Sequence, residues 1–434
     1  MRTSAKLKTC LIKMPEWFIA IYAAICSFAV YFCMYAFRKP FTVAGFEGMV
    51  YWHIDYKVWL VTAQVVGYML SKFYGIRFIS SLNKTTRAGM IIKLILCSWA
   101  ALLLFALIPS PYSIIFLLLN GFPLGMVWGL VFSYLEGRRA TEFMGAVLCT
   151  SFIFSSGVVK TIGKSILLYW HVTEAWMPFV TGSLFVLPLF LFTWLLNHLP
   201  EPTKNDELMR CKRKAMNKEE RRSFIKSFFP GILLIVTTYV LLTILRDFRD
   251  NFANELFAEM GFSNDASIFS ISESYVSLFV LLCISLLVLV KNNFTAFLLN
   301  HYIIISGYLI ALISTLFYMR QDISPFTWMI LAGTGLYLSY VPFNALYFER
   351  MIACYRINAN VGFIMYISDA FGYLGSVLVL FLKEFIGIQL SWTNFFITMV
   401  IIISIAGMLG TLIASIYFQK KYSNRRTNEL SYTK

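Results

Sequence analysis

Residues 16–40 read EWFIAIYAAICSFAVYFCMYAFRKP, an apolar run that ends abruptly in Arg38, Lys39 and Pro40. About 20 apolar residues are enough for one helix to cross the hydrocarbon core of a bilayer. This run therefore predicts a membrane-spanning helix over residues 16–37. Similar runs predict further spans near 56–80, 89–109, 111–135, 143–169, 175–198, 228–250, 267–290, 295–318, 325–348, 358–383 and 391–418, which makes twelve.

The composition of the 434 residues agrees with this interpretation. Hydrophobic residues make up 59% of the chain and charged residues 14%, whereas soluble domains carry about a quarter charged residues. A soluble fold could not bury so much apolar surface, so a soluble enzyme, a fibrous protein and a disordered chain are excluded. The eight cysteines form no CxxC pair and the four histidines show no ligand spacing. We expect no catalytic residues, no metal and no cofactor.

The formal net charge of +15 could suggest a nucleic-acid partner, but its distribution indicates a membrane topology. Most of the 37 Lys and Arg residues fall in ends and loops that share one side if the N-terminus is cytoplasmic. The loops on the opposite side hold Lys39, Lys57, Arg320 and Lys383. Cytoplasmic loops of membrane proteins carry the excess of basic residues. We therefore expect both termini in the cytoplasm and no nucleic acid as partner.

A polar stretch from Glu201 to Lys226 divides the spans six and six. It predicts an N-terminal half over 1–200, a basic cytoplasmic linker over 201–226, a C-terminal half over 227–418 and a basic cytoplasmic tail over 419–434. The predicted fold class is an all-α integral membrane protein with two pseudo-symmetric halves of six helices. Proteins built in this way hold their substrate near the bilayer midplane, where the halves meet.

Charges inside the spans are the residues most informative about function, because each costs at least about 2.5–3.5 kcal/mol unless it faces a cavity or a partner. The cations within or at the edge of spans are Arg38, Lys72, Lys160, Lys164, Arg246 and Arg249. The acids are fewer: Glu273 and Asp369, with Asp250 at an edge. If the cations converge on one cavity, that cavity attracts an anion. The alternatives are lysines that reach the headgroups and an Arg246–Asp250 pair at i, i+4.

Aromatic hydroxyls accompany two of these cations. Tyr31, Tyr35 and Arg38 share one helical face at i, i+4 and i+7, and Tyr68 and Lys72 are also four residues apart. A guanidinium offers a planar fork of donors that matches phosphate, and an ammonium adds a point charge. The spacing therefore predicts an anion site, with plain aromatic packing as the alternative.

The same residues resemble the organophosphate:phosphate antiporters of the major facilitator superfamily. Their Tyr-x3-Tyr-x2-Arg-Lys motif of the first helix reads Tyr31, Tyr35, Arg38 and Lys39 here. The remaining similar motifs are Tyr68-x3-Lys72, Gly121-Phe122-Pro123, Arg246 to Phe252, Tyr340-Val-Pro342 and Phe371-Gly-Tyr-Leu-Gly375. The whole chain also resembles an uncharacterised bacterial branch of the superfamily called DUF5690.

The resemblance implies a substrate site made of Arg38, Arg246, Lys72, Lys160, Tyr31, Tyr35, Tyr68, Tyr340, Tyr373 and Phe122. The resemblance also implies a transport mechanism in which one phosphate bridges Arg38 and Arg246 and so draws the two halves together. The chain departs from the family in three places. The histidine of the fifth helix is missing near Phe154, so Lys160 is a candidate replacement; Phe122 stands for a tryptophan; and the loop over 75–80 lacks the usual Asp.

The resulting hypothesis is a secondary transporter in a bacterial inner membrane that moves a small organic anion, in exchange for phosphate, by alternating access. A monomer in the lipid bilayer is expected. Two alternatives remain open. One is a proton-coupled carrier of a sugar, peptide or drug-like solute, with Asp369 as the coupling carboxylate. The other is a membrane sensor of sugar phosphates.

Overall fold

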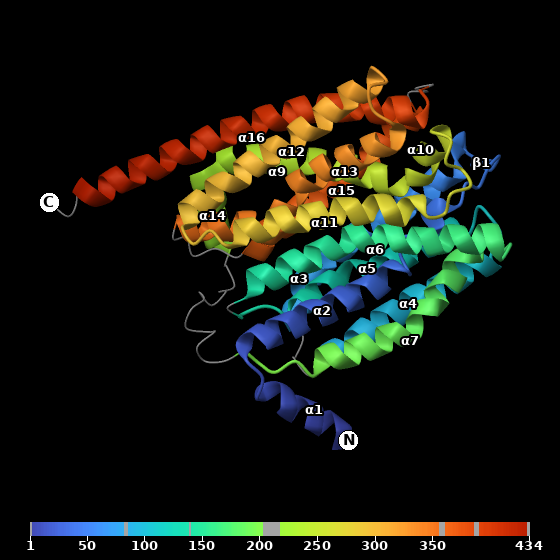
Figure 1. Ribbon diagram of the computed structural model, residues 1–434, viewed down its shortest axis with the longest axis horizontal. Coiled ribbons are helices and arrows are strands. Elements are labelled where there is room, and N and C mark those ends of the chain that lie inside the picture. Colours follow the sequence, from blue (N-terminus) through green and yellow to red (C-terminus); the bar gives the residue numbers. More distant parts are fainter. Residues whose placement is uncertain are drawn as a thin grey trace.

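The computed structural model describes residues 2–81, 86–138, 140–202, 218–355, 361–385 and 390–431, and long helices dominate it. The helices form two groups that lie side by side (Figure 1). The N-terminal group contains α2 (Glu16–Tyr35), α3 (Tyr56–Ser81), α4 (Arg87–Leu107), α5 (Ile114–Phe132), α6 (Thr141–Tyr169) and α7 (Met177–Asn197). The C-terminal group contains α9 (Lys218–Asn251), α10 (Ala253–Glu259), α11 (Ile268–Val288), α12 (Asn293–Met319), α13 (Pro325–Pro342), the π-helical turn η3 (Phe343–Tyr347), α14 (Phe348–Cys354), α15 (Val361–Phe385) and α16 (Trp392–Ser431).

Each predicted span coincides with one of these long helices. Ten of the described helices are long and apolar enough to cross a membrane. The helices α3 and α15 are also long, with 26 and 25 residues, and each carries a charged residue of the candidate site, Lys72 in α3 and Asp369 in α15. The chain is thus a multi-pass membrane protein, and the count of twelve spans stays a prediction. Most of the predicted linker, residues 203–217, lies outside the described residues.

Proline and capping side chains set several helix boundaries. The helix α2 begins directly after Pro15, and Pro40 opens the short 3-10 helix η1 (Pro40–Val43) that follows it. Proline lacks an N–H group and has a fixed φ, so it suits the first turn of a helix. The side chain of Asn292 accepts hydrogen bonds from the backbone N–H groups of Phe294 and Thr295 at the start of α12. Such a cap satisfies donors that the helix leaves free.

The two ends of the bundle differ in structure. At one end, β1 (Val50–Tyr51) pairs with β2 (Ile54–Asp55) in an antiparallel hairpin, near α10. The two turn residues, Trp52 and His53, both have positive φ, as a type I′ turn requires. We call this the hairpin end. The opposite end holds α1 (Arg2–Ile12) and the last turns of α16, and we call it the termini end.

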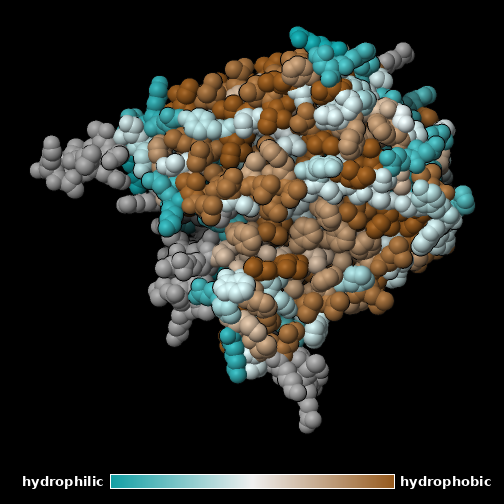
Figure 2. Space-filling model, in the orientation of Figure 1, coloured by the Kyte–Doolittle hydropathy of each residue, from teal (hydrophilic) through white to brown (hydrophobic). Residues whose placement is uncertain are grey.

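The two groups meet where α3 packs against α15 and α6 packs against α11. The second contact is very close: a Cβ atom on Gly157 of α6 would lie 2.6 Å from the Cβ of Glu273 and from the carbonyl oxygen of Phe269 in α11. Outside this interface the helices expose apolar side chains, which cover much of the face shown in Figure 2. The charged residues described next are therefore enclosed by an apolar shell.

Candidate functional site

Cations and tyrosines from both groups meet between α2 and α3 on one side and α9, α13 and α15 on the other. We call this set the central cluster. It consists of Arg38, Tyr68, Lys72, Tyr239, Arg246, Tyr340, Asp369 and Tyr373. All but Arg246 and Asp369 are among the buried residues.

Aromatic contacts join the two predicted arginines. The guanidinium carbon of Arg38 lies 4.0 Å from the ring centre of Tyr68. The rings of Tyr68 and Tyr373 meet edge-on at 5.1 Å, and the guanidinium carbon of Arg246 lies 5.7 Å from the ring of Tyr373. Cations attract the faces of aromatic rings, more strongly when water is excluded. The structure thus links both arginines through two tyrosines, and a phosphate shared between them stays a prediction.

Hydrogen bonds and an ion pair join the cluster on its other side. The guanidinium of Arg246 donates to the hydroxyl of Tyr340, whose oxygen lies 2.9 Å from the hydroxyl of Tyr239. Tyr239 in turn donates to the carboxylate of Asp369. Asp369 forms an ion pair of 3.1 Å with Lys72, which comes from the N-terminal group. Asp369 therefore links the two groups directly.

The cations of the cluster differ in how far they are neutralised. Asp247 accepts from Nε and Nη2 of Arg246 at 3.1 and 2.7 Å, so the predicted alternative of an Arg246–Asp250 pair is wrong. Lys72 is paired with Asp369. Arg38 is only 6% exposed, has no carboxylate partner among the described residues, and leaves its Nε without a hydrogen bond. The cluster therefore carries an excess positive charge that belongs to Arg38.

The other predicted tyrosines lie around Arg38. The rings of Tyr31 and Tyr35 are 5.5 Å apart, and the ring of Tyr35 lies 5.7 Å from the guanidinium carbon of Arg38. Phe122 differs: its ring contacts Tyr74, a side chain that is 54% exposed. That contact places Phe122 beside an exposed side chain of α3, apart from the contacts that build the cluster.

A second set of charges lies toward the hairpin end, and it contains Lys160. We call it the hairpin-end cluster. Four lysines of the N-terminal group and the η1 segment contact acceptors of α9 and α10 in the C-terminal group. The lysines are Lys39, Lys57, Lys160 and Lys164, and the acceptors are Asp250, Asn251, Asn254 and Glu255.

Asp250 is the centre of this second cluster. Its carboxylate lies 2.5 Å from the ammonium groups of both Lys39 and Lys160, and it accepts from the hydroxyl of Ser156 at 2.5 Å. Lys160 also donates to the backbone carbonyl of Asp250. The ammonium of Lys160 is therefore engaged in a contact between the groups. Its predicted role as a replacement for the missing histidine stays a prediction.

Lys57 and Lys164 complete the hairpin-end cluster. Lys57 pairs with Glu255 and donates to the carbonyl of Thr42 at 2.6 Å, and Lys164 donates to Asn254 at 3.0 Å. These contacts hold the two groups together at the hairpin end. Lys160 is 2% exposed and paired with Asp250, so a side chain extended to the headgroups does not describe it.

Sequence reasoning missed Tyr239, Asp247 and the role of Lys39. Tyr239 and Arg246 are seven residues apart, the same spacing as Tyr31 and Arg38. This repeated spacing on the first helix of each group is the signal that could have identified Tyr239. Among the described residues, no group of three or more His, Cys, Asp and Glu side chains could hold a metal ion.

Comparisons with known proteins agree with this architecture. The sequence profile of a family described as "Family of unknown function (DUF5690)" matches residues 40–421. No protein of curated function matches the chain in sequence. The crystal structure of a D-xylose-proton symporter aligns with a TM-score of 0.65 at 16% identity, over 92% of this chain and 97% of that one.

Two further solved structures are similar in fold. The nucleoside transporter NupG, in a mutant form, aligns with a TM-score of 0.60 at 15% identity, over 92% of this chain and 100% of that one. The human organic anion transporter MFSD10 (TETRAN) aligns with a TM-score of 0.54 at 11% identity, over 91% of this chain and 100% of that one. The chain therefore has the fold of the major facilitator superfamily.

Proposed function

The chain belongs to the DUF5690 family, and from this membership and its fold we propose that it is a secondary transporter of a small organic anion. A fold alone does not decide a substrate. One of the similar structures is described as a D-xylose-proton symporter and another as an organic anion transporter. The choice between such substrates has to come from the central cluster.

The observation that carries the proposal is the unneutralised guanidinium of Arg38. A buried charge without a counter-charge is costly, because the low-dielectric interior replaces its water. Arg246 and Lys72 have Asp247 and Asp369 as counter-charges, whereas Arg38 contacts tyrosine rings and lacks a carboxylate among the described residues. A bound anion would supply the missing counter-charge.

A phosphorylated metabolite is the proposed class of anion. A guanidinium offers a planar fork that fits two phosphate oxygens, and the hydroxyls of Tyr68 and Tyr373 add neutral donors close by. The motif resemblance to organophosphate:phosphate antiporters supports the same class. An anion placed between Arg38 and Arg246 would compete with Asp247 for Arg246 and would draw the two groups together. Without an anion the cluster keeps an excess positive charge. This charge favours exchange of one anion for phosphate over the return of an empty carrier.

Binding measurements test this proposal. Purified protein is screened by thermal unfolding against phosphate, sugar phosphates, carboxylates and neutral sugars. A ligand at a hundred times its dissociation constant stabilises the folded state by about 2.7 kcal/mol. Arg38→Lys keeps the charge but loses the fork, and hydrogen bonds to charged groups contribute about 1.5–3 kcal/mol, so binding should weaken about tenfold or more.

A double-mutant cycle then separates a shared anion from two independent roles. If one phosphate contacts both guanidiniums, Arg38→Lys and Arg246→Lys should be non-additive in their effect on affinity. Stabilisation by neutral sugars alone, or unchanged anion affinity in the double Lys variant, would contradict an anion site at Arg38.

Proton coupling is a second candidate, and the Lys72–Asp369 pair favours it. Asp369 lies in the interface between the groups, held by Lys72 and Tyr239. Protonation of Asp369 would release Lys72 and weaken the link between α3 and α15. Uptake that follows a pH gradient, with no response to phosphate on the opposite side, would favour this candidate.

A wider proposal concerns the domain boundaries of the chain and its location in the cell. We propose two halves over 1–200 and 227–418, with the linker 201–226 and the tail 419–434 in the cytoplasm of a bacterium. We also propose that the protein acts as a monomer in the inner membrane, that it is not an enzyme, and that it needs no cofactor.

A further inference from the structure

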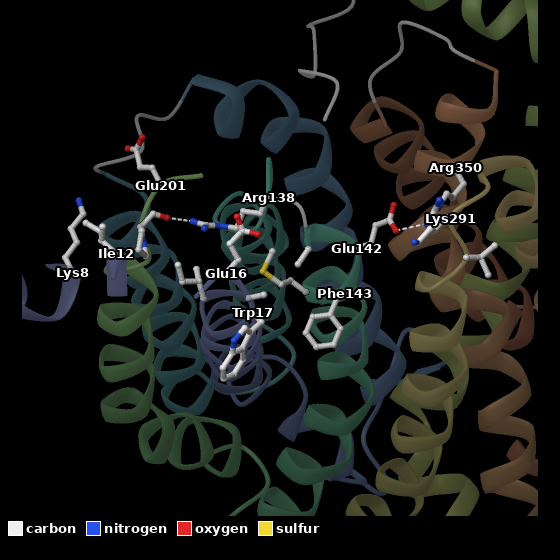
Figure 3. A pocket seen from close by; sticks show the side chains of 16 residues that line it. Lys8, Ile12, Glu16, Trp17, Arg138, Glu142, Phe143, Glu201, Lys291 and Arg350 are labelled. Carbon is white, nitrogen blue, oxygen red and sulfur yellow. Dashed lines mark hydrogen bonds and ion pairs between the residues drawn. The ribbon is translucent and has the colours of Figure 1, made fainter. Parts of the chain in front are cut away.

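A cavity of about 1050 Å³ opens at the termini end, and none of the central-cluster residues lines it. It lies between the two groups (Figure 3). On one side are α1 and the beginnings of α2 and α6, and on the other are the segment after α11 and the helix α14. We call this cavity the termini-end groove.

One wall of the groove is apolar and continues the outer surface of the bundle. Trp17 and Phe143 project into it from the first turns of α2 and α6. Trp17 is 65% exposed and Ile12 is 62% exposed, although both stand beside apolar helices of membrane length. Tryptophan is enriched where a membrane meets water. The exposed apolar side chains of this wall therefore suit contact with lipid near the headgroup level.

The opposite rim of the groove is basic. Lys291 is exposed and makes no hydrogen bond or ion pair with the described residues. Arg350 is 7% exposed; its Nη2 donates to Glu142 at 2.8 Å and its Nη1 donates to Asn293 at 2.8 Å. Its Nε is buried and has no hydrogen-bond partner. On the other side of the groove, α1 supplies Lys8, which is also exposed.

We propose that the termini-end groove binds one anionic phospholipid, with its phosphate at Lys291 and Arg350 and an acyl chain along Trp17 and Phe143. The groove offers both surfaces that this molecule needs. A free phosphate would leave the apolar wall uncovered, and a zwitterionic lipid would gain less from the basic rim. Anionic lipids are attracted to basic residues at the membrane surface by about fivefold in affinity for each residue.

The test uses native mass spectrometry of the full-length protein in detergent. Phosphatidylglycerol and phosphatidylcholine with identical acyl chains are added separately, and inorganic phosphate is added as a third arm. The expected result is one retained phosphatidylglycerol at concentrations where phosphatidylcholine is mostly lost. Inorganic phosphate should neither bind in the groove nor displace the lipid.

Two substitutions locate the lipid. Lys291→Gln should weaken phosphatidylglycerol binding about fivefold and leave phosphatidylcholine unchanged. Trp17→Ala should weaken both lipids to a similar extent, because it removes apolar contact only. Lys226→Gln is the matched control, since Lys226 is an exposed lysine that does not line the groove. It should have no effect.

Several outcomes would overturn the proposal. These are equal retention of the two lipids, displacement of the lipid by inorganic phosphate, and an effect of Lys226→Gln as large as that of Lys291→Gln. Thermal unfolding without lipid should be the same for all three variants. If Lys291→Gln unfolds earlier, Lys291→Arg is measured as well; it keeps the charge and should retain the preference for phosphatidylglycerol, and loss of that preference would contradict the proposal.

Discussion

Replacing Asp250 by Asn should open the bundle at the hairpin end. Asp250 holds Lys39 and Lys160 at 2.5 Å each, and both lysines belong to the N-terminal part of the chain. Asn keeps one acceptor oxygen but loses the charge, so two buried ammonium groups remain without a counter-charge. Removing one partner of a buried ion pair costs about 3–5 kcal/mol. We take about 3 kcal/mol, because the carbonyl of Asp250 still accepts from Lys160.

This cost applies only while the hairpin end is closed, since water solvates the lysines once the groups separate. About 3 kcal/mol corresponds to roughly a hundredfold change in the ratio of open to closed molecules. Thr161 of α6 reports on the closure, because its hydroxyl accepts from the backbone N–H of Ser270 in α11. A cysteine at position 161 should therefore react with a maleimide up to about a hundredfold faster in Asp250→Asn. Peptide mass spectrometry resolves this cysteine from the native ones.

Matched variants make this prediction specific. Asp322→Asn removes an exposed acid and should leave the labelling rate unchanged. Lys39→Met and Lys160→Met should each have a smaller effect than Asp250→Asn, since Asp250 keeps the other lysine. The double lysine variant should again have a large effect, because it leaves a buried carboxylate unpaired. An unchanged labelling rate in Asp250→Asn, with its folding intact, would refute the reasoning.

Three further predictions concern helix packing, proton coupling and membrane topology. Gly157→Ala should destabilise the protein by about 1–3 kcal/mol, because the new Cβ would meet Glu273 and Phe269 at 2.6 Å; the control Gly89→Ala, which has nothing within 4 Å, should be neutral or stabilising in thermal unfolding. If the second candidate, proton coupling, holds, Asp369→Asn should abolish uptake driven by a pH gradient but retain exchange of labelled substrate in vesicles; full uptake would exclude Asp369 from coupling. A cysteine introduced at Asn205 should be labelled by an impermeant reagent only after cells are opened, and labelling of intact cells would reverse the proposed topology.

The sequence predicted the helices well because apolar length is a local property. Each predicted span overlaps one long helix, although α9 begins earlier than predicted, at Lys218, and α16 ends later, at Ser431. The hairpin was not predicted, since its turn residues Trp52 and His53 are not the Asn and Gly residues that usually mark such turns. Helix-face spacing also identified Tyr31, Tyr35 and Arg38 as neighbours.

The partners of the charges could not be predicted in the same way. Lys39 and Asn251 are 212 positions apart, and Lys57 and Glu255 are 198 positions apart. Their contacts depend on how the two groups pack, which no local pattern encodes. The sequence also left open whether Arg246 pairs with Asp250, and the structure pairs it with Asp247, its neighbour in α9.

The division of charge in the hairpin-end cluster also bears on assembly. All four of its lysines come from the chain before residue 165, and all of its acceptors come from residues 250–255. Two copies of the first group would therefore bring lysines against lysines, and like charges in close contact repel. Only the unlike combination neutralises this surface. A chain cut within residues 203–217 should for this reason yield two fragments that recognise each other when made together, and domain-swapped pairs of identical fragments should be disfavoured.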